Sequence, residues 1–225
     1  MRVAVLADVH GNLPALQAVL KDVDRAASEE VWCAGDLVGY NPWPTEVLEV
    51  LRGRKVRAIR GNHDRAVLSG DTSSFNEAAS AAVRWTRIVI APWAVGYLKG
   101  LEDRARGSLA DAVVAMYHGS PRDDDEYVFP WAAHEELLAL ARADIVLLGH
   151  THLPFVFRSG ARLVANPGSV GQPRDGDPRA SWGLLDTARR TFELRRVAYD
   201  IDAVANGIRR AGLPPPLADR LYAGV

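Results

Sequence analysis

Cysteine and net charge are both nearly absent from the chain. Cys33 is the single cysteine among 225 residues, so no internal disulfide can form and we expect a reducing compartment. The 27 lysines and arginines almost balance 28 acidic residues, which leaves a formal net charge of −1. Such a balance gives no overall field that would attract nucleic acid or an anionic membrane. We therefore do not expect nucleic acid as a partner, and any recognition of phosphate must be local.

Long hydrophobic runs are missing as well. No apolar run reaches the roughly 18 residues of a membrane span. The first residues, MRVAVLAD, lack the charged region, long apolar stretch and cleavage site of a secretory signal. These absences predict a soluble, cytoplasmic protein that does not enter a membrane. Because we find no repeats and no low-complexity linker, we expect one domain over residues 1–225.

Strand and helix patterns alternate in the first part of the chain. Short apolar runs at residues 3–7, 30–34 and 55–59 indicate buried strands, and helical periodicity lies between them at residues 13–23 and 45–51. This alternation predicts parallel crossover units, whose ligand sites lie beyond the carboxyl ends of the strands.

The pattern of predicted helices and strands changes in the rest of the chain. Helical periodicity covers residues 76–90 and 132–143, and strands are expected at 112–116 and 144–148. Residues 154–169 and 181–200 each resemble two strands around a polar turn, which predicts antiparallel hairpins and a mixed sheet or a pair of sheets. A helix is expected at residues 201–211, whereas the proline-rich tail from residue 212 receives no assignment.

Side chains suited to metal binding gather where the predicted strands end. Five of the six histidines are in this set. The set consists of Asp8, His10, Asp36, Asn62, His63, Asp64, His118, His150 and His152. Taken one at a time, each is an ordinary turn or cap residue, but their joint position at the ends of strands favours one ligand site.

The donor types favour a pair of divalent ions. Oxygen and imidazole donors without thiolate suit Mn, Fe, Ni, Zn or Co better than a closed structural zinc site, and Cys33 lies inside an apolar run where a core position fits best. The candidates exceed what one ion needs, so two metals sharing a carboxylate is the economical interpretation. Two such ions activate water for hydrolysis of phosphate esters. His63 beside Asp64 fits the group that gives a proton to the leaving oxygen.

The ordered motifs resemble those of a known family. The sequence contains ADVH, AGD, RGNHD, YHGS and GHTH, spanning positions 8 to 152. This order resembles the calcineurin-like metallophosphoesterases, and VANPGSVGQPRDGDPRASWGLLD is similar to their small single-domain bacterial and archaeal phosphodiesterases. The resemblance implies a four-layer αββα sandwich of two mixed sheets flanked by helices.

The resemblance also implies roles for individual residues. Asp8, His10 and His152 would hold the first metal. Asn62, His118 and His150 would hold the second, with Asp36 bridging the two. His63 would be the general acid and Asp64 its orienting carboxylate. Manganese is one of the ions that such a site accepts.

Further residues are candidates for substrate contact. Tyr40 and Asn41 follow Asp36 closely, and Asn166 and Ser169 lie in the turn NPGS; packing and turn roles are the alternatives for all four. Arg174 and Arg179 are candidates for phosphate contact, with surface salt bridges as the alternative.

Together these features predict a phosphodiesterase that acts on small organic phosphate esters. One alternative is a non-catalytic protein-binding scaffold on the same fold, as in a retromer subunit that resembles this family. Another is a dinucleotide polyphosphate pyrophosphatase, which shares these motifs. The motifs leave open the physiological substrate, the preference for mono- or diesters, the native metal and whether the chain forms a homo-oligomer.

Overall fold

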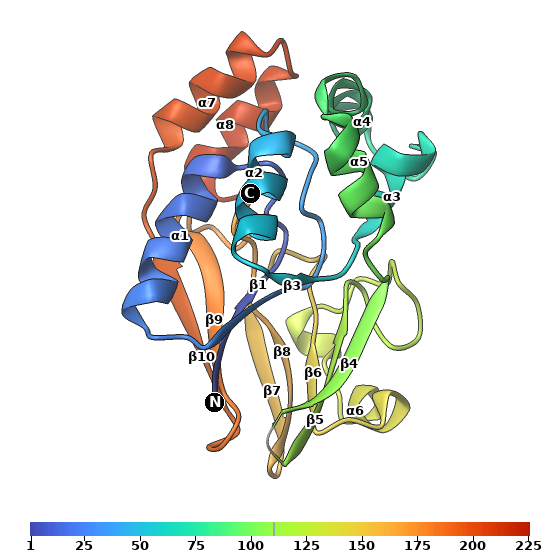
Figure 1. Ribbon diagram of the computed structural model, residues 1–225, viewed down its shortest axis with the longest axis vertical. Coiled ribbons are helices and arrows are strands. Elements are labelled where there is room, and N and C mark those ends of the chain that lie inside the picture. Colours follow the sequence, from blue (N-terminus) through green and yellow to red (C-terminus); the bar gives the residue numbers. More distant parts are fainter. Residues whose placement is uncertain (110) are drawn as a thin grey trace.

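Two five-stranded sheets face each other in the computed structural model, which describes residues 1–109 and 111–225 (Figure 1). The first sheet has the order β10 (Thr191–Val197), β9 (Ala180–Asp186), β1 (Arg2–Leu6), β2 (Glu30–Cys33) and β3 (Arg57–Ala58). The second has the order β4 (Arg104–Leu109), β5 (Ala112–Tyr117), β6 (Ile145–Leu147), β8 (Arg162–Asn166) and β7 (Phe155–Ser159).

The helices are unevenly distributed around the sheets. Most of them gather in the upper part of Figure 1, and α6 lies apart beside the second sheet. Their bounds are α1 (Leu13–Arg25), α2 (Pro44–Gly53), α3 (Asn62–Ser69), α4 (Glu77–Val89), α5 (Pro92–Lys99), α6 (Glu136–Ala141), α7 (Ile201–Arg210) and α8 (Pro215–Ala223). A short 3-10 turn, Pro130–Ala132, precedes α6.

The strand pairing confirms the predicted mixture of parallel and antiparallel units. β1, β2 and β3 pair in parallel through the crossover helices α1 and α2, and β5, β6 and β8 also pair in parallel. The two expected hairpins are present as β7 with β8 and β9 with β10. All parallel strands within one sheet end at the same edge, which brings the loops after them together.

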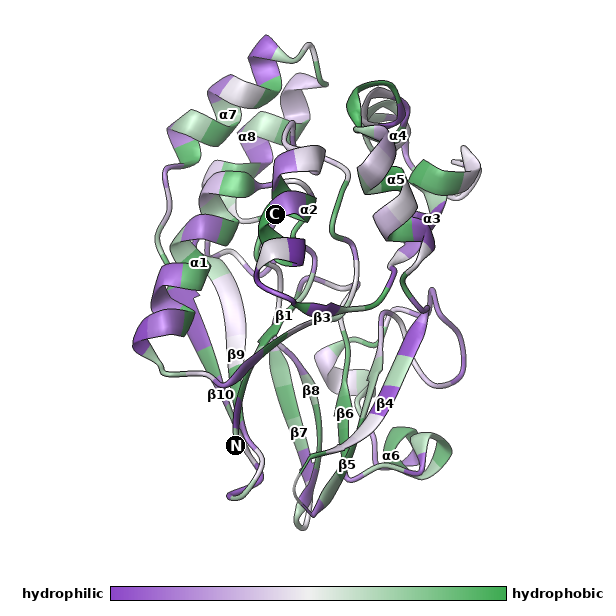
Figure 2. Cartoon of the chain, viewed as in Figure 1, coloured by the Kyte–Doolittle hydropathy of each residue, from purple (hydrophilic) through white to green (hydrophobic). Residues whose placement is uncertain are grey.

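Alternation along the strands separates the layers. On β1, Ala4 and Leu6 pack against the outer helices, whereas Val3 and Val5 pack between the sheets. A third core lies between β5, β6, β8 and α6. The expected four layers are therefore confirmed, with α6 as the principal helix outside the second sheet. Figure 2 shows the hydrophobic colour on the interior strand β6 and hydrophilic residues on the edge strand β4.

Among the residues that the structure describes, the sequence patterns did not predict the α-helices α3, α5 and α8 or the strand β4. β4 pairs with β5 as an edge strand whose residues alternate between exposed and half-buried, so it lacks the apolar run of an interior strand. Helices α7 and α8 pack with α4 and Tyr40 in a fourth apolar cluster, which brings the end of the chain close to the loop after β2. In the described part of the chain, no helix has the length and apolar character needed to cross a membrane.

Candidate metal centre

The structure brings all seven candidate ligands together at the carboxyl ends of the parallel strands. Asp8 and His10 follow β1, Asp36 follows β2, and Asn62 begins α3 directly after the loop that follows β3. From the second sheet come the loop after β5 and the loop after β6, which carry His118, His150 and His152. Asn62 is partly buried, and the other six are almost completely shielded from solvent.

Left-handed backbone conformations mark these loops. Non-glycine residues rarely adopt a φ near +50° to +70°, and such strain clusters at functional sites. Five of the seven candidates do so: Asp8 (53°), His10 (50°), Asp36 (53°), His150 (70°) and His152 (59°). In this backbone conformation the side chains leave the direction of the preceding strands and point toward a common site.

The first cluster consists of Asp8, His10 and His152, and the unprotonated nitrogens of its two histidines point at each other. His10 Nδ1 lies 3.2 Å from the carbonyl of Val38, and His152 Nδ1 lies 2.5 Å from the carbonyl of Gln172. A carbonyl only accepts, so each Nδ1 carries the proton and each Nε2 presents a lone pair. The two Nε2 atoms nevertheless face each other at 3.1 Å, with Asp8 Oδ1 3.6 Å from His152 Nε2. Such a group of acceptors fits a cation between them.

The second cluster consists of Asn62, His118 and His150, and it also brings two histidine nitrogens together. His118 Nδ1 donates to the carbonyl of Ala34 at 2.8 Å, and His150 Nε2 donates to the carbonyl of Asp125 at 3.1 Å. The remaining nitrogens, His118 Nε2 and His150 Nδ1, are 3.1 Å apart. Asn62 Oδ1 lies 3.0 Å from His118 Nε2. These donors also fit a cation.

Asp36 lies between the two clusters. Its Oδ2 is 3.5 Å from His10 Nε2 and 3.4 Å from His118 Nε2. One carboxylate is therefore close to a nitrogen of each cluster, which is the position that a shared ligand requires.

The titration behaviour of the histidines agrees with this donor set. Burial lowers the pKa of His150 to about 3, and it lowers the pKa values of His10 and His152 well below the usual range. These rings are therefore neutral and available as ligands. Against the effect of burial, the Asp36 carboxylate raises the pKa of His118 to about 9. The second cluster thus attracts a positive charge.

His63 lies beside both clusters. Its ring centroid is 4.7 Å from that of His10, 4.4 Å from Tyr40 and 4.7 Å from Phe75. Its Nδ1 is buried and makes no hydrogen bond to any described residue. Burial lowers the pKa of this imidazole to about 4. His63 also forms a group with His10 and Asp36 that is compact enough to hold a metal, so proximity alone does not separate a ligand from a proton donor.

Asp64 does not contact the His63 imidazole, contrary to the expected orienting role. Its carboxylate instead accepts hydrogen bonds from the backbone N–H groups of Leu37 (3.0 Å), Val38 (3.1 Å) and Gly61 (3.0 Å). As the third residue of α3, Asp64 points back over the start of the helix, where these three donors converge. It therefore ties the loop after Asp36 to the helix that carries His63.

Three of the four predicted substrate-contacting residues lie behind the ligands. Asn41 Nδ2 donates to the carbonyl of His10 at 2.9 Å, and Ser169 Oγ donates to the carbonyl of Asp8 at 2.7 Å. Asn166 Nδ2 donates to the carbonyl of Gly149 at 2.7 Å. All three side chains are buried, and none lines the cavity next to His63. In the structure each one instead holds a loop that carries candidate ligands, so substrate contact by these three stays an untested expectation.

Tyr40, the fourth, does line a small cavity next to the clusters. The cavity measures about 140 Å³, and its walls include Tyr40, Asn62, His63, Phe75, Arg174 and Arg220. Of the two arginines considered for phosphate contact, Arg174 is in the wall, whereas Arg179 pairs with Asp177 at 2.7 Å on the surface. Phe75 and Arg220 were missed. Arg220 lies on α8, in the proline-rich tail, although prolines at the start of that helix are a recognised initiation signal.

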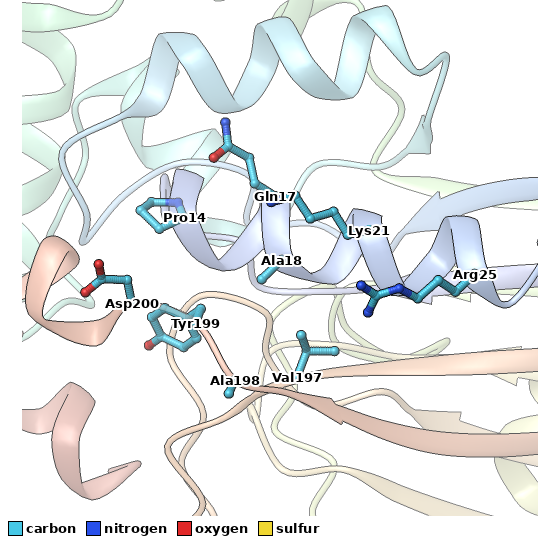
Figure 3. A pocket seen from close by; sticks show the side chains of 9 residues that line it. All are labelled: Pro14, Gln17, Ala18, Lys21, Arg25, Val197, Ala198, Tyr199 and Asp200. Atoms are coloured by element: carbon cyan, nitrogen blue, oxygen red, sulfur yellow. The ribbon is translucent and has the colours of Figure 1, made fainter.

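A separate groove of about 390 Å³ lies between α1 and residues 197–200 (Figure 3). The long side chains of Lys21 and Arg25 extend along α1, and Tyr199 and Asp200 come from the opposite side. Its nine lining residues include none of the candidate ligands. The clustered donors therefore define the candidate site, although the groove has the larger volume.

Comparison with known proteins gives consistent matches. The family model described as "Calcineurin-like phosphoesterase superfamily domain" matches residues 1–190. The crystal structure of a metallophosphoesterase from Sphaerobacter thermophilus has a TM-score of 0.86 and 35% identity, covering 100% of this chain and 99% of that one. The uncharacterized protein MJ0912 of Methanocaldococcus jannaschii is 33% identical, covering 99% and 98%. Phosphodiesterase YfcE of Escherichia coli strain K12 is 29% identical, covering 83% and 88%.

These matches extend over the ordered motifs and over both sheets. The family model spans every candidate ligand, from Asp8 to His152. The resemblance inferred from the five motifs is thereby confirmed. The chain belongs to the calcineurin-like phosphoesterase superfamily, a family of hydrolases that act on phosphate esters.

Proposed function

We propose that this chain hydrolyses phosphodiesters of small molecules at a centre of two divalent metal ions. The observation that carries the proposal is the pair of clusters in which histidine nitrogens face each other at 3.1 Å, once between His10 and His152 and once between His118 and His150. In the first pair burial keeps both rings neutral, and neutral rings would not be held in this way without a positive charge between them. In the second pair the raised pKa of His118 indicates that the site favours a positive charge. Since Asp36 approaches both clusters, we propose two ions that share it.

The ligand sets follow from the clusters. Asp8, His10 and His152 would hold one ion, and Asn62, His118 and His150 the other. Nitrogen and oxygen donors accept first-row divalent ions in general, so Mn, Fe, Co, Ni and Zn are all chemically suitable, and we take manganese as the first ion to test. When bound, such a pair neutralises phosphate oxygens and acidifies a water molecule.

We assign the proton transfer to His63. In hydrolysis a bond forms between a water oxygen and phosphorus, and the bond between phosphorus and the leaving oxygen breaks. The leaving oxygen must then receive a proton. His63 lies in the wall of the cavity, while its Nδ1 is buried beside Gly39 without a hydrogen bond to the described chain, so we assign the transfer to the Nε2 side of the ring. A phosphate anion beside the ring favours the protonated form and so opposes the effect of burial.

The size of the cavity favours small substrates. A cavity of about 140 Å³ next to the ligands accommodates one compact group and no extended peptide. A relative named as a phosphodiesterase supports a diester over a monoester substrate. We further propose that residues 1–225 work as one domain, because Arg220 on α8 lines the same cavity as Asn62 on α3. A cytoplasmic location stays a prediction, in keeping with the free and buried Cys33.

Hydrolysis of bis(p-nitrophenyl) phosphate by the purified chain tests the proposal. We expect turnover with added manganese or nickel and none after removal of divalent ions with a chelator. Restoring the metal should restore the rate. Failure to cleave any of a panel of phosphate mono-, di- and cyclic esters with any of the five metals would refute the proposal and favour the scaffold alternative.

A further inference from the structure

Among the described residues, the two arginines in the wall of the cavity have no acidic side chain as a partner. The ten residues that line it include Arg174 and Arg220 and no aspartate or glutamate. Neither arginine pairs with an aspartate or glutamate side chain within the described chain, although both are half-buried. Burial and the nearby Arg174 lower the pKa of Arg220, as expected of two close guanidinium groups.

Several donors of these arginines are still available. Arg174 Nη2 donates to Tyr40 Oη at 3.3 Å and to Gln172 Oε1 at 3.0 Å, whereas its Nη1 has no acceptor among the described residues. Arg220 donates from Nε to a main-chain oxygen of Val225, the last residue of the sequence, and its two Nη atoms have no acceptor among the described residues. Guanidinium groups with spare paired donors match the oxygens of a phosphate.

The arginines at the two ends of the groove beside the candidate metal centre differ in their partners. A second cavity shares Asn62, Ser74 and Phe75 with the first, so the two form one groove across Asn62. At the far end of this groove lies Arg65, which pairs with Asp103 and Asp125. Within the described groove, the guanidinium groups that lack an acidic side-chain partner are therefore at the end that contains Arg174, Arg220 and His63.

We propose that Arg174 and Arg220 bind a phosphate group carried by the leaving group of the substrate. This inference rests on the proposed function: His63 gives its proton to the leaving oxygen, so the leaving group enters the cavity that His63 and the arginines share. A scissile phosphate over the metal centre then places a neighbouring phosphate between the two arginines. The favoured substrates are esters or anhydrides with a second phosphate on the leaving side, ahead of diesters whose leaving group is neutral.

Two substrates separate this inference from the proposed function. Bis(p-nitrophenyl) phosphate releases a leaving group without a phosphate, whereas hydrolysis of ADP to AMP and inorganic phosphate expels a phosphate-bearing group whichever phosphorus is attacked. Steady-state kcat/KM is measured for both at a fixed free manganese concentration, for the wild type and for Arg174→Gln and Arg220→Gln. Arg210→Gln, an exposed arginine on α7, is the matched control. Manganese content and the urea midpoint are measured for each variant to identify any that fail to fold.

We expect each cavity variant to lose at least about tenfold more kcat/KM on ADP than on the diester, as charge-assisted hydrogen bonds to a phosphate predict. The control should change both values by less than about twofold, the scatter expected of surface substitutions. Equal losses on the two substrates, or a wild type that cleaves the diester and not ADP, would overturn the inference and leave the proposed function intact. A wild type that cleaves no phosphate ester would instead refute the proposed function. If one of the two cavity variants fails to fold, the ratio of kcat/KM values for the other variant tests the inference.

Discussion

Asp36 Oδ1 accepts a hydrogen bond from the backbone N–H of His63 at 2.8 Å. The carboxylate proposed to bridge two ions therefore also fixes the start of the helix that carries the proposed proton donor. Metal binding and proton transfer share one structural support, but they depend on different side chains. Substitutions can separate them.

Replacement of Asp36 should abolish both metal binding and activity. Asp36→Asn keeps the shape of the side chain but removes the charge that lies close to His10 Nε2 and His118 Nε2. Since a bound ion contributes several kcal/mol to the stabilisation of the transition state, we expect activity to fall by at least about 10³-fold. Metal content is measured by elemental analysis after gel filtration. A variant that retains two ions per chain would contradict the bridging role.

Replacement of His63 should separate chemistry from metal binding. In His63→Ala we expect kcat on bis(p-nitrophenyl) phosphate to fall by about 10² to 10⁴-fold, the usual contribution of a general acid. Both ions should remain, because the two proposed ligand sets are complete without His63. A loss of one ion per chain would show instead that His63 is a ligand, a role that its proximity to His10 and Asp36 also permits.

Asp64 should matter for stability through the backbone. Its carboxylate satisfies three buried N–H groups, those of Leu37, Val38 and Gly61. Hydrogen bonds to charged groups contribute about 1.5–3 kcal/mol each, and donors left without a partner are costly, so Asp64→Ala should lower the free energy of unfolding by at least about 2 kcal/mol. Urea denaturation measures this change. A variant as stable as the wild type would mean that the three donors find other acceptors.

Tyr199 should make the protein sensitive to alkaline pH. Burial raises the pKa of its hydroxyl from 10 to about 12. Between these values the unfolded chain loses the phenol proton while the folded chain keeps it, so folding stability is lost as the pH rises from about 10 to 12. The loss expected from this group is about 1–2 kcal/mol. Tyr199→Phe should flatten this part of the curve of unfolding free energy against pH, and an unchanged slope would contradict the assignment.

The positions of the candidate ligands could be predicted because they are local in the sequence. Asp8 and Asp36 each follow an apolar strand within three residues, and parallel strands must end at a common edge. The hairpin of β9 and β10 could also be predicted, because two strand-like runs flank a polar turn. These features are set by short stretches of the chain.

The residues that complete the cavity depend on long-range packing. Arg220 reaches the cavity only because α8 packs with α7, α4 and Tyr40, and no local pattern encodes that contact. The role of Asp64 was misjudged for the same reason: its neighbour in sequence is His63, but its hydrogen-bond partners include Leu37 and Val38, across the loop after β2. A sequence motif identifies a functional residue, but it does not show which residues form hydrogen bonds with it.

Anomalous diffraction at the manganese absorption edge, from crystals grown with manganese, is the decisive test for the proposed pair of ions. We expect two peaks roughly 3.5–4 Å apart, the spacing of dinuclear hydrolases. One should lie between Asp8, His10 and His152, the other between Asn62, His118 and His150, with Asp36 touching both and His63 touching neither. A single peak, or a peak coordinated by His63, would contradict the proposal.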